Sequence, residues 1–489
     1  MIDKMLYKYG MFSEYIPPCF NSIMLYEKIG NVRTSYETRN ISECVELPIY
    51  KTDITRRIIK VPNPEQYVYL CEELKKNISY IERTINSNAN TESNPFRLYK
   101  GKKILDIPLY CELKNISSRY SDSLKCRIRY SMGYKYQLKI DISKFYDSIY
   151  THIIEWCVSG VKKKGSPNWG TELDYAVRSS QLQQTKGIPT GPFTSRIISE
   201  FILASIDNEL KEAGMIFKHY VDDYKFYFRT ESEAIKELKI ISYIFSKYKL
   251  ELNDSKTKID KYPYDIQSNL NQITYVGRKM SEKESIIYII NECNRLYNSG
   301  EQASYKYILK TFQKLKKGDL KQWPYIESFF LSILTIKPDL ARFISKIILD
   351  HQELISEDFV EKLKEILVSN IEEKNECEVL WILWLLIHLN AINYDYDILY
   401  SLLQIKNDFI LVMVIDFIKG NGISNDKINS QMSIIEKYLE NTEFSESNWL
   451  LLYEAVIKKW FKNKNITNKK NNNKFFKVLI SNKIDFYVN

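Results

Sequence analysis

The pattern of apolar residues changes near residue 290, and this change constrains the fold more than any other feature of the sequence. Before it, short runs typical of strands, such as residues 136–143 and 219–229, alternate with helical patterns such as residues 194–210 and 233–248. After it, strand patterns stop, and helix-like apolar segments follow one another with short polar breaks. We therefore expect an α+β part, residues 1–288, followed by an all-α part, residues 289–489, that forms a helical repeat domain.

The composition is that of folded domains in a reducing compartment. Of the 489 residues, 44% are hydrophobic and 27% are charged, which excludes wholesale disorder. The eight cysteines form no CxxC pair, so neither a zinc ribbon nor a disulfide framework is expected. The longest apolar run, residues 379–389, is too short to cross a bilayer, and no signal-peptide core is found near the start. We expect a cytoplasmic protein without membrane contact.

The positive charge is concentrated in the first part of the chain. The net charge is +9. Residues 1–290 hold 44 Lys and Arg against 35 Asp and Glu, whereas the remainder holds 26 of each. The excess is densest from residue 97 to residue 139, where basic residues are interleaved with aromatic ones. This pattern suits a phosphate-rich partner, although a solvated surface has the same composition.

Three acids stand at the ends of predicted strands. Asp222 and Asp223 lie in HYVDDYKFYF with apolar or aromatic residues on both sides, which predicts the bend of a β-hairpin. Asp141 ends another apolar strand. If the two strands end side by side, these carboxylates can hold two Mg²⁺ ions for a phosphoryl transfer. Adjacent acids are also common in turns, so the dipeptide alone indicates little.

A turn rich in glycine and proline lies between these acids. The segment QTKGIPTGPFTSRIISE (183–200) contains Gly187, Pro189, Gly191 and Pro192 ahead of a predicted helix. Such a turn lets the backbone approach a nucleotide closely, but it is also what an ordinary loop before a helix contains.

The order and spacing of these segments resemble the palm of reverse transcriptases, over roughly residues 10–285. Tyr220-Val221-Asp222-Asp223 resembles their YxDD motif. The other matches are IDISKFY (140–146) to the first acidic motif, GIPTGP (187–192) to the loop before the primer-grip-facing helix, LNDSKTK (252–258) to the later lysine motif, YVGR (275–278) to the turn after it, and RRIIKVP (56–62) to the first fingers motif. The resemblance implies reverse-transcriptase fingers and palm.

Within that family, three segments look most like the bacterial defence-associated enzymes of the abortive-infection (AbiK- and AbiA-like) group. They are SEYIPPCF (13–20), SIYTHIIEW (148–156) and LDYAVRSSQLQQTKGIPTGP (173–192). Members of that group carry a C-terminal helical-repeat domain, which agrees with the serial helices after residue 290. The resemblance implies polymerisation of dNTPs in anti-phage defence, without a template and from a protein primer, or on a bound non-coding RNA.

The resemblance also implies roles for single residues at the acidic site. Asp141 and Asp222 are the expected metal ligands, with Asp223 as a weaker one and the backbone carbonyl of Ile142 completing a site for Mg²⁺ or Mn²⁺. Tyr146, five residues after Asp141, holds the place of the aromatic steric gate that favours dNTPs. A core aromatic at helical spacing would have the same position.

Other residues are candidates for contact with the nucleotide. Lys256 is expected to protonate the leaving pyrophosphate or to contact the triphosphate. Arg127 or Arg129, on the basic segment before the first acidic strand, could hold the triphosphate, and Gly187 and Pro189 could line the nucleotide site.

Two features near the motifs receive no functional role. The four histidines show no metal-ligand spacing, so His219, although it flanks the acidic hairpin, is expected in a core or surface role. Residues 86–94 (NSNANTESN) are typical of a polar loop.

The sequence is best interpreted as that of a Mg²⁺-dependent DNA polymerase, a nucleotidyltransferase that binds dNTPs, a DNA product and, on one reading, a non-coding RNA. Three alternatives stay open: a retron or group-II-intron reverse transcriptase, an RNA-dependent RNA polymerase, and a non-enzymatic nucleic-acid-binding assembly protein. The all-helical second part disfavours the first, Tyr146 and the YxDD form disfavour the second, and the intact acids disfavour the third. Self-association is also expected, because helical arrays offer long packing faces.

Overall fold

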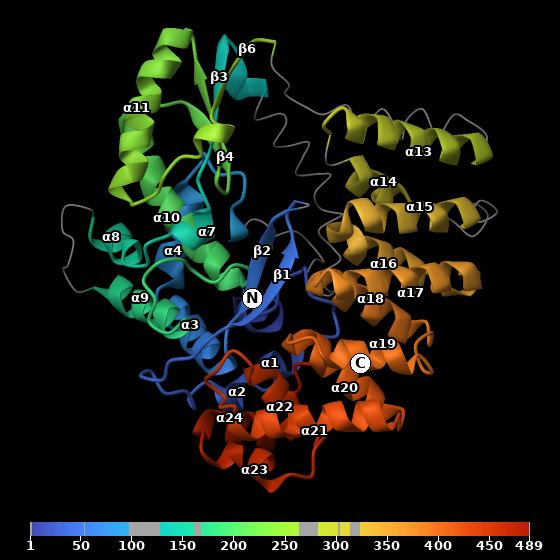
Figure 1. Cartoon of the computed structure of the whole chain (residues 1–489). Helices are drawn as coiled ribbons and strands as arrows, with labels where there is room; N and C mark the ends of the chain where they lie inside the picture. The colour runs from blue at the N-terminus through green and yellow to red at the C-terminus, as the bar shows by residue number, and fades with distance from the viewer. Residues whose placement is uncertain are drawn as a thin grey trace.

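The α+β part and the helical part occupy different regions of the molecule (Figure 1). The computed structural model describes residues 2–52, 54–96, 128–160, 168–263, 282–301, 304–312 and 323–488. Within these residues all strands precede residue 262, and every element from residue 282 onward is helical. The predicted fold class is therefore confirmed. The segment YVGR (275–278), which resembles the turn after the lysine motif, lies outside the described residues.

A four-stranded antiparallel sheet lies at one end of the α+β part (Figure 1). Its order is β4 (Phe217–Tyr220), β5 (Asp223–Phe228), β3 (Tyr136–Asp141), β6 (Lys258–Lys261). Two long helices, α10 (Phe193–Glu212) and α11 (Glu231–Lys247), pack together, and α11 contacts β3 and β5. The buried residues of α11 include Ala234, Ile241 and Phe245, at the spacing of one helical face. Burial of this face fixes the strands at whose ends the acids lie.

The remaining elements of the α+β part include a second, smaller sheet and several short helices. A separate hairpin consists of β1 (Val45–Tyr50) and β2 (Arg56–Val61). The helix after it begins at Pro64, where the side chain of Asn63 accepts a hydrogen bond from the N–H of Glu65 and caps the first turn. The other elements are η1 (Lys4–Lys8), α1 (Ile23–Glu27), α2 (Ile29–Val32), α3 (Pro64–Lys76), α4 (Ile78–Ser87), α7 (Phe145–Ser148), α8 (Ile153–Ser159), α9 (Trp169–Ser179) and η5 (Asp254–Lys256).

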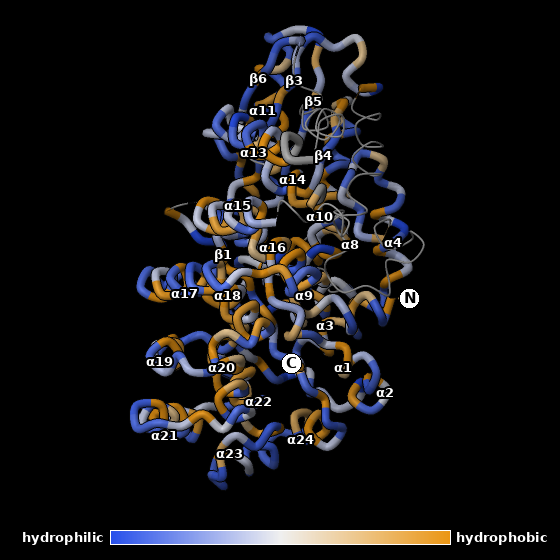
Figure 2. The backbone as a smooth tube through the Cα atoms, turned by 90° about the vertical axis from the view of Figure 1, so that its right-hand side faces the viewer, coloured by the Kyte–Doolittle hydropathy of each residue, from blue (hydrophilic) through white to orange (hydrophobic). Residues whose placement is uncertain are grey.

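The helical part is a stack of short helices beside the α+β part (Figure 1). Figure 2 shows that α20 and α22 are mostly hydrophobic along their length, whereas α17 and α21 carry many hydrophilic residues. The helices are α13 (Glu282–Asn298), α14 (Ser304–Phe312), α15 (Trp323–Ile336), α16 (Ala341–Leu349), α17 (Glu357–Glu372), α18 (Glu376–His388), α19 (Tyr396–Leu403), α20 (Asp408–Gly420), α21 (Asp426–Asn441), α22 (Trp449–Ile457), α23 (Lys464–Thr467) and α24 (Lys474–Ser481), with the 3₁₀ turns η7 (Pro338–Leu340), η8 (Gln352–Leu354) and η9 (Lys469–Asn471).

The longest apolar run of the sequence is a buried helix, as predicted. It forms α18, in which every residue from Cys377 to Ile387 is buried. This helix contacts α16, α17 and α20 and also β1, so an apolar surface all round it is required. Among the described residues no helix combines the length and hydropathy needed to cross a membrane.

The two parts share one apolar core. The end of the chain returns to its beginning, where the N–H of Asn21 donates to the carbonyl of Phe486 at 2.9 Å and the N–H of Val488 donates to the carbonyl of Cys19 at 2.8 Å. Phe20 packs edge-on against Phe409 of α20, with ring centroids 5.1 Å apart. The helical part is therefore packed into the polymerase-like part and is not a tethered module.

Candidate active site

The acidic hairpin turns in two residues at one end of the sheet. Strands β4 and β5 are joined by Val221 and Asp222, and Tyr220 and Asp223 form the last pair of the ladder. On the other side of β5, Asp223 lies directly opposite Asp141, the last residue of β3. The structure thus brings the three predicted acids together. Asp223, and not Asp222, is the register partner of Asp141.

A third segment runs along the end of β3 and orients its backbone. The N–H of Asn253 donates to the carbonyl of Asp141, and the N–H of Ser143 donates to the carbonyl of Glu251, each at 2.8 Å. Because successive residues of an extended strand point their carbonyls to opposite edges, the carbonyl of Ile142 points away from this segment and toward the acidic hairpin. This is the direction that the predicted role of Ile142 requires.

Two polar side chains from the same segment contact Asp141. The ammonium of Lys256 lies 3.0 Å from Oδ2 of Asp141, and Nδ2 of Asn253 donates to the same oxygen at 3.2 Å. The side chain of Lys256 is 59% exposed, so this ion pair contributes little to stability. The ion pair matters because it places Lys256, the residue predicted to protonate pyrophosphate, within reach of the acids.

The three acids repel one another. Burial, together with the charges of Asp223 and Asp141, raises the pKa of Asp222 to about 6, while Lys256 acts in the opposite direction. The pKa of Asp223 is also raised, by burial and then by Asp141. Crowded carboxylate oxygens of this kind are the ligands that Mg²⁺ prefers, so the residues fit a divalent cation. Among the described residues, however, no three acidic, His or Cys side chains already have the spacing of a complete metal cage.

The Gly/Pro loop packs against the polypeptide itself. Gly187 has φ +87°, and a Cβ there would lie 3.3 Å from the backbone carbonyl oxygen of Asp147. Its N–H donates to the carbonyl of Ile149 at 2.8 Å, and Pro189 is buried. Gly191 has φ +126° and abuts β2. Packing within the chain therefore accounts for both glycines, as in an ordinary loop before a helix, and approach of this loop to a nucleotide stays a prediction.

Tyr146 lies between α10 and the acids. The hydroxyl of Ser199, on α10, donates to the hydroxyl of Tyr146 at 3.5 Å. Burial raises the pKa of Tyr146, and the charge of Asp222 adds to this effect. The ring centroid lies 5.4 Å from that of Phe145. The partly buried ring thus packs against the core and lies near Asp222.

The predicted basic residues are only partly described. Arg127 lies outside the described residues. Arg129 is exposed, in a helical turn at residues 128–131 ahead of β3. The predicted contact of one of these arginines with a triphosphate stays a prediction.

A buried polar cluster beneath the hairpin is the main feature that sequence reasoning missed. His219 and Asp207 are fully buried, and Nε2 of His219 lies 2.9 Å from Oδ2 of Asp207. Asp207 also accepts hydrogen bonds from the hydroxyl of Tyr224 at 2.8 Å and from Nδ2 of Asn88 at 2.5 Å. Although burial alone would lower the pKa of His219, the carboxylate of Asp207 raises it to about 9. His219 was expected in a core or surface role, and it lies in the core.

The loop at residues 88–94 completes this cluster. It runs beside β4, where the N–H of His219 donates to the carbonyl of Asn90 and the N–H of Glu92 donates to the carbonyl of His219. Thr91 and Ser93 both donate to the buried carboxylate of Glu200 on α10. The segment is a polar loop, as predicted, but most of it is buried. The one signal in the sequence is that Glu200 and Asp207, seven residues apart, lie among the apolar residues of the face that α10 buries.

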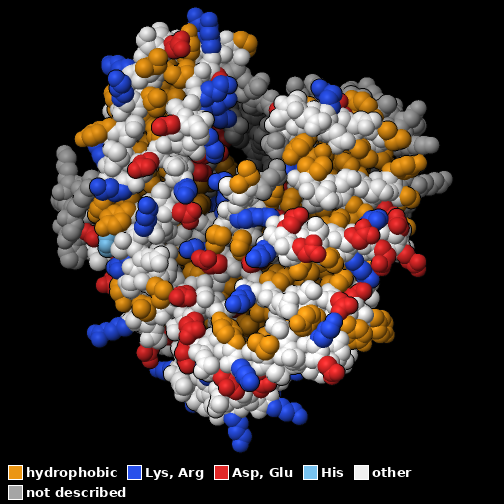
Figure 3. Space-filling view, in the orientation of Figure 1, with side chains coloured by type: hydrophobic (Ala, Val, Ile, Leu, Met, Phe, Trp, Pro, Cys, Tyr) orange, Lys and Arg blue, Asp and Glu red, His pale blue; other side chains and the backbone are white. Residues whose placement is uncertain are grey.

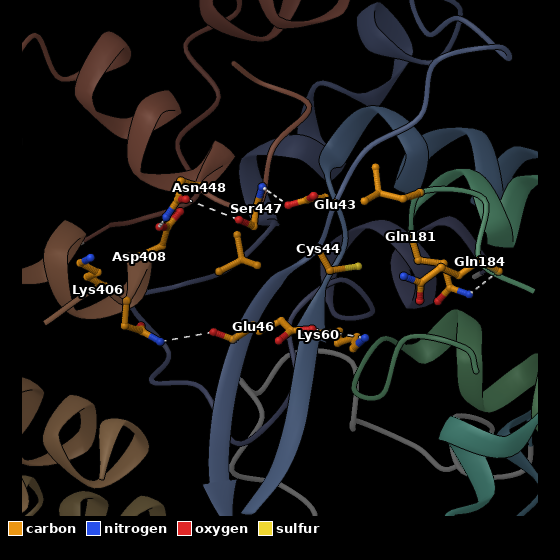
Figure 4. A pocket seen from close by; sticks show the side chains of 13 residues that line it. Glu43, Cys44, Glu46, Lys60, Gln181, Gln184, Lys406, Asp408, Ser447 and Asn448 are labelled. Atoms are coloured by element: carbon orange, nitrogen blue, oxygen red, sulfur yellow. Dashed lines mark hydrogen bonds and ion pairs between the residues drawn. The ribbon is translucent and has the colours of Figure 1, made fainter. Parts of the chain in front are cut away.

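An open cavity lies elsewhere, between the β1–β2 hairpin, residues 181–184, the start of α20 and the residues just before α22 (Figure 4). Its volume is about 400 Å³. Most of its charged groups have partners: Lys60 lies 3.3 Å from Glu46, and Asp408 accepts from Nδ2 of Asn448 and from the N–H of Leu451. We therefore interpret the cavity as part of the polar interface between the two parts of the molecule and not as a second reactive site.

Comparison with known proteins identifies the domain. Residues 71–280 match the family described as reverse transcriptase (RNA-dependent DNA polymerase). The chain therefore carries a reverse transcriptase domain, which is of the nucleotidyltransferase class. No curated protein matched the chain.

Solved telomerase structures are similar over part of their length. One is apo telomerase from Candida tropicalis, truncated from its C-terminal domain, at 14% identity over 47% of this chain and 52% of that one, with a TM-score of 0.29. Another is telomerase from Candida albicans in complex with a TWJ fragment of telomeric RNA, at 11% identity over 69% of this chain and 64% of that one, with a TM-score of 0.31. The chain spans about half to less than two thirds of these proteins, and similarity at this level carries no functional argument.

Proposed function

We propose that this protein is a divalent-cation-dependent DNA polymerase of the reverse-transcriptase type. The observation that carries the proposal is the strand register that sets Asp141 opposite Asp223, with Asp222 in the adjoining turn. The reaction is in-line attack of a hydroxyl oxygen on the α-phosphate of a dNTP, which forms one P–O bond and breaks the bond to pyrophosphate.

In this proposal the acids hold the cations. Asp141, Asp222, Asp223 and the carbonyl of Ile142 would bind Mg²⁺, or Mn²⁺ in its place. When bound, the ions supply charge stabilisation for the attacking and leaving oxygens. The raised pKa values of Asp222 and Asp223 are consistent with a site that gains stability when a cation offsets the repulsion among these acids.

Four further roles extend the proposal to the nucleotide. Lys256, already within 3.0 Å of Asp141, donates a proton to the leaving pyrophosphate. Tyr146 acts as the steric gate against a ribose 2′-OH. Arg127 or Arg129 contacts the triphosphate, and Gly187 and Pro189 shape the loop beneath the nucleotide. The position of Tyr146 beside α10, near Asp222, supports its role best.

We further propose that the protein serves anti-phage defence by untemplated, protein-primed DNA synthesis. The motif resemblance to abortive-infection enzymes and the helical second part support this. We place the domain boundary at residue 288, which falls within α13, and we propose that the helices after it form repeats that pair with a second copy in the cytoplasm. A second candidate, synthesis on a bound non-coding RNA, is favoured by the match to RNA-dependent DNA polymerases.

The shape of the molecule is compatible with a nucleic-acid partner. In Figure 3 the surface is hollowed between the region of the sheet and the upper helices of the second part. Lys and Arg side chains border the hollow on the side of the sheet. A phosphate backbone would be attracted to such an edge.

Labelled-dNTP incorporation by the purified protein with Mg²⁺ tests these proposals. Reactions are run with and without RNase pretreatment, and products are resolved before and after protease digestion. Label that stays with protein until protease releases it, and that is insensitive to RNase, supports untemplated, protein-primed synthesis. Incorporation that RNase abolishes supports the RNA-templated candidate. No incorporation by the wild-type protein with dNTPs, but incorporation with rNTPs, would overturn the assignment as a DNA polymerase.

A further inference from the structure

Val221 occupies a backbone conformation that valine rarely adopts. It has φ +53°, in the left-handed region, at the first position of the two-residue turn between β4 and β5. A positive φ at this position usually requires glycine, because a β-branched side chain is crowded there. The neighbouring residue is Asp222. The surrounding structure must therefore hold the turn that presents this acid.

Both backbone polar groups of Val221 are held by buried side chains. Its N–H donates to Oγ of Ser93 at 2.8 Å, and its carbonyl lies 2.9 Å from Nδ1 of His219. The side chain of Ser93 comes from a loop more than a hundred residues earlier in the chain. Neither contact belongs to the hydrogen-bonded ladder of the hairpin, so each is an additional restraint on the turn.

The partners of His219 fix its hydrogens. A carbonyl oxygen and a carboxylate oxygen only accept hydrogen bonds, so Nδ1 must donate to Val221 and Nε2 must donate to Asp207. Asp207 is itself held by the hydroxyl of Tyr224 and by Asn88. The ring of His219 stacks on that of Tyr224, with centroids 4.5 Å apart. The imidazole therefore cannot turn away from the carbonyl of Val221 without breaking buried contacts.

The partners of Ser93 likewise determine which hydrogen bond its hydroxyl donates and which it accepts. Its hydroxyl donates to the carboxylate of Glu200, which also accepts from Thr91 at 2.9 Å. Since the single hydrogen of the hydroxyl is used on Glu200, a lone pair remains for the N–H of Val221. Glu200 and Asp207 lie on one face of α10, so a single helix anchors both restraints.

We propose that Ser93 and His219 are positioning residues that hold Val221 in the left-handed conformation and thereby fix the direction of the Asp222 carboxylate. This inference rests on the proposed function, because it assigns the purpose of the turn to that site. Neither residue contacts a reacting group. Their effect passes through the backbone of Val221.

A double-mutant cycle tests the role of Ser93 against simple packing. Ser93→Ala removes the acceptor for Val221, and Val221→Gly removes the crowding that makes the restraint necessary. We expect Ser93→Ala to lower kcat and the affinity for Mn²⁺ about tenfold in the wild-type background, but less than about threefold in the Val221→Gly background. An equal loss in both backgrounds would overturn the proposal. Ser179→Ala, at a buried serine whose hydroxyl donates to the carbonyl of Ala176, is the matched control and should change neither quantity.

Two substitutions separate the two contacts of His219. His219→Asn places an amide donor near the position of Nδ1 and keeps the contact with Val221, whereas His219→Gln places one near Nε2 and keeps the contact with Asp207. We expect His219→Asn to retain at least about tenfold more activity and Mn²⁺ affinity than His219→Gln. The reverse order would show that His219 acts by holding Asp207. Both changes remove the imidazolium that pairs with the buried carboxylate of Asp207, which can prevent folding. If neither variant folds, the double-mutant cycle of Ser93→Ala and Val221→Gly tests the positioning role.

Readouts that need no catalysis separate this inference from the proposed function. Mn²⁺ binding is measured by electron paramagnetic resonance, and hydrogen exchange is followed in the peptide that contains Val221. Wild-type protein that binds Mn²⁺ but incorporates no nucleotide contradicts the proposed function alone. Unchanged exchange of that peptide in Ser93→Ala, compared with wild type, contradicts the positioning role whatever the activity.

Discussion

The two hairpins of the α+β part are held in opposite ways. The β4–β5 hairpin turns in two residues and rests on a buried polar cluster supplied by α10 and by residues 88–94, all within the polymerase-like part. The β1–β2 hairpin has an exposed connection, in which Ile54 is 94% exposed, and is held by the helical part. The guanidinium of Arg56 pairs with the buried carboxylate of Glu378, 322 positions later in the chain.

This difference indicates which parts of the site are preorganised and which depend on the second part of the chain. The turn that carries Asp222 is held by hydrogen bonds with buried side chains of the α+β part itself. The hairpin that resembles the fingers motif depends on α18 and its neighbours: Tyr50 lies under the side chains of both Arg56 and Lys337, at 5.8 and 5.3 Å from the ring centroid. The helical part therefore belongs to the framework of the enzyme as well as to any partner surface.

The largest expected effect comes from the acids of the β4–β5 hairpin. Asp222→Asn should lower dNTP incorporation at least about 100-fold, because a charged ligand of the site is lost. The same change removes repulsion from Asp141 and Asp223, so thermal stability should be unchanged or slightly raised. Incorporation assays and melting curves, run in parallel, measure both effects.

The control for this change is an exposed acid in the helical part. Asp397→Asn, at a side chain that is 90% exposed, should leave both incorporation and melting unchanged. A loss of stability in Asp222→Asn that matches its loss of activity would show that the acid serves folding and would contradict the proposed role.

The second largest effect is expected when the ion pair between the β1–β2 hairpin and α18 is removed. Arg56→Ala leaves the carboxylate of Glu378, which is 3% exposed, buried without its cation. The free energy of unfolding should fall by about 3 kcal/mol. Chemical denaturation measures the loss, and hydrogen exchange should rise in residues 45–61 more than in β4 and β5.

A neighbouring ion pair on the same hairpin provides the control. Lys60 and Glu46 lie 3.3 Å apart but are partly exposed, so Glu46→Ala should change the free energy of unfolding by about 0.5 kcal/mol or less. Equal effects of Arg56→Ala and Glu46→Ala would mean that the helical part does not support this hairpin through Arg56.

A third effect concerns the C-terminal segment that ties the helical part to residues 19–21. Oε1 of Glu454 accepts from the N–H groups of Phe486 and Tyr487, while Oε2 has no hydrogen-bond partner among the described residues. Burial raises the pKa of Glu454 to about 8. Between pH 4.5 and about 8 the folded protein therefore binds more protons than the unfolded chain, and its stability falls as the pH rises.

Glu454→Gln should remove this pH dependence. The difference in the free energy of unfolding between the variant and the wild type should shift in favour of the variant, on the order of 2 kcal/mol, from pH 5 to pH 8. Melting temperatures from pH 5 to pH 9 measure it. Parallel curves for the two proteins would show that the carboxyl does not titrate in this range.

The meeting of the three acids could be predicted from the sequence because the evidence for it is local. Each acid ends a run of apolar residues with the period of a strand, and β4 and β5 are joined by a short turn. The partner of Asp141 could not be fixed, since a shift of one residue in register exchanges Asp222 for Asp223.

The supports of the two hairpins could not be predicted, because their partners are remote in the sequence. A solvated loop and a buried loop with paired polar groups have the same composition, so residues 86–94 gave no sign that Ser93 reaches Glu200, 107 positions away. Likewise, RRIIKVP indicates a basic strand of the fingers but not the pairing of Arg56 with Glu378. Both supports depend on polar groups that pair only in the folded protein, and such pairs cannot be identified from a single sequence.

The smallest expected effect lies where the Gly/Pro loop contacts β2 of the β1–β2 hairpin. The carbonyl of Thr190 accepts a hydrogen bond from the N–H of Lys60 in β2, and a Cβ on Gly191 would lie 3.0 Å from Cγ2 of Ile59. At φ +126° an alanine is also strained, so Gly191→Ala should lower the free energy of unfolding by about 1–2 kcal/mol. Gly420→Ala, at a helical glycine whose Cβ would meet nothing within 4 Å, should instead stabilise by up to about 1 kcal/mol. Urea denaturation of the two variants compares them. If Gly191→Ala were as stable as wild type, the loop would have room to move away from β2, and the support of the β1–β2 hairpin would come from the helical part alone.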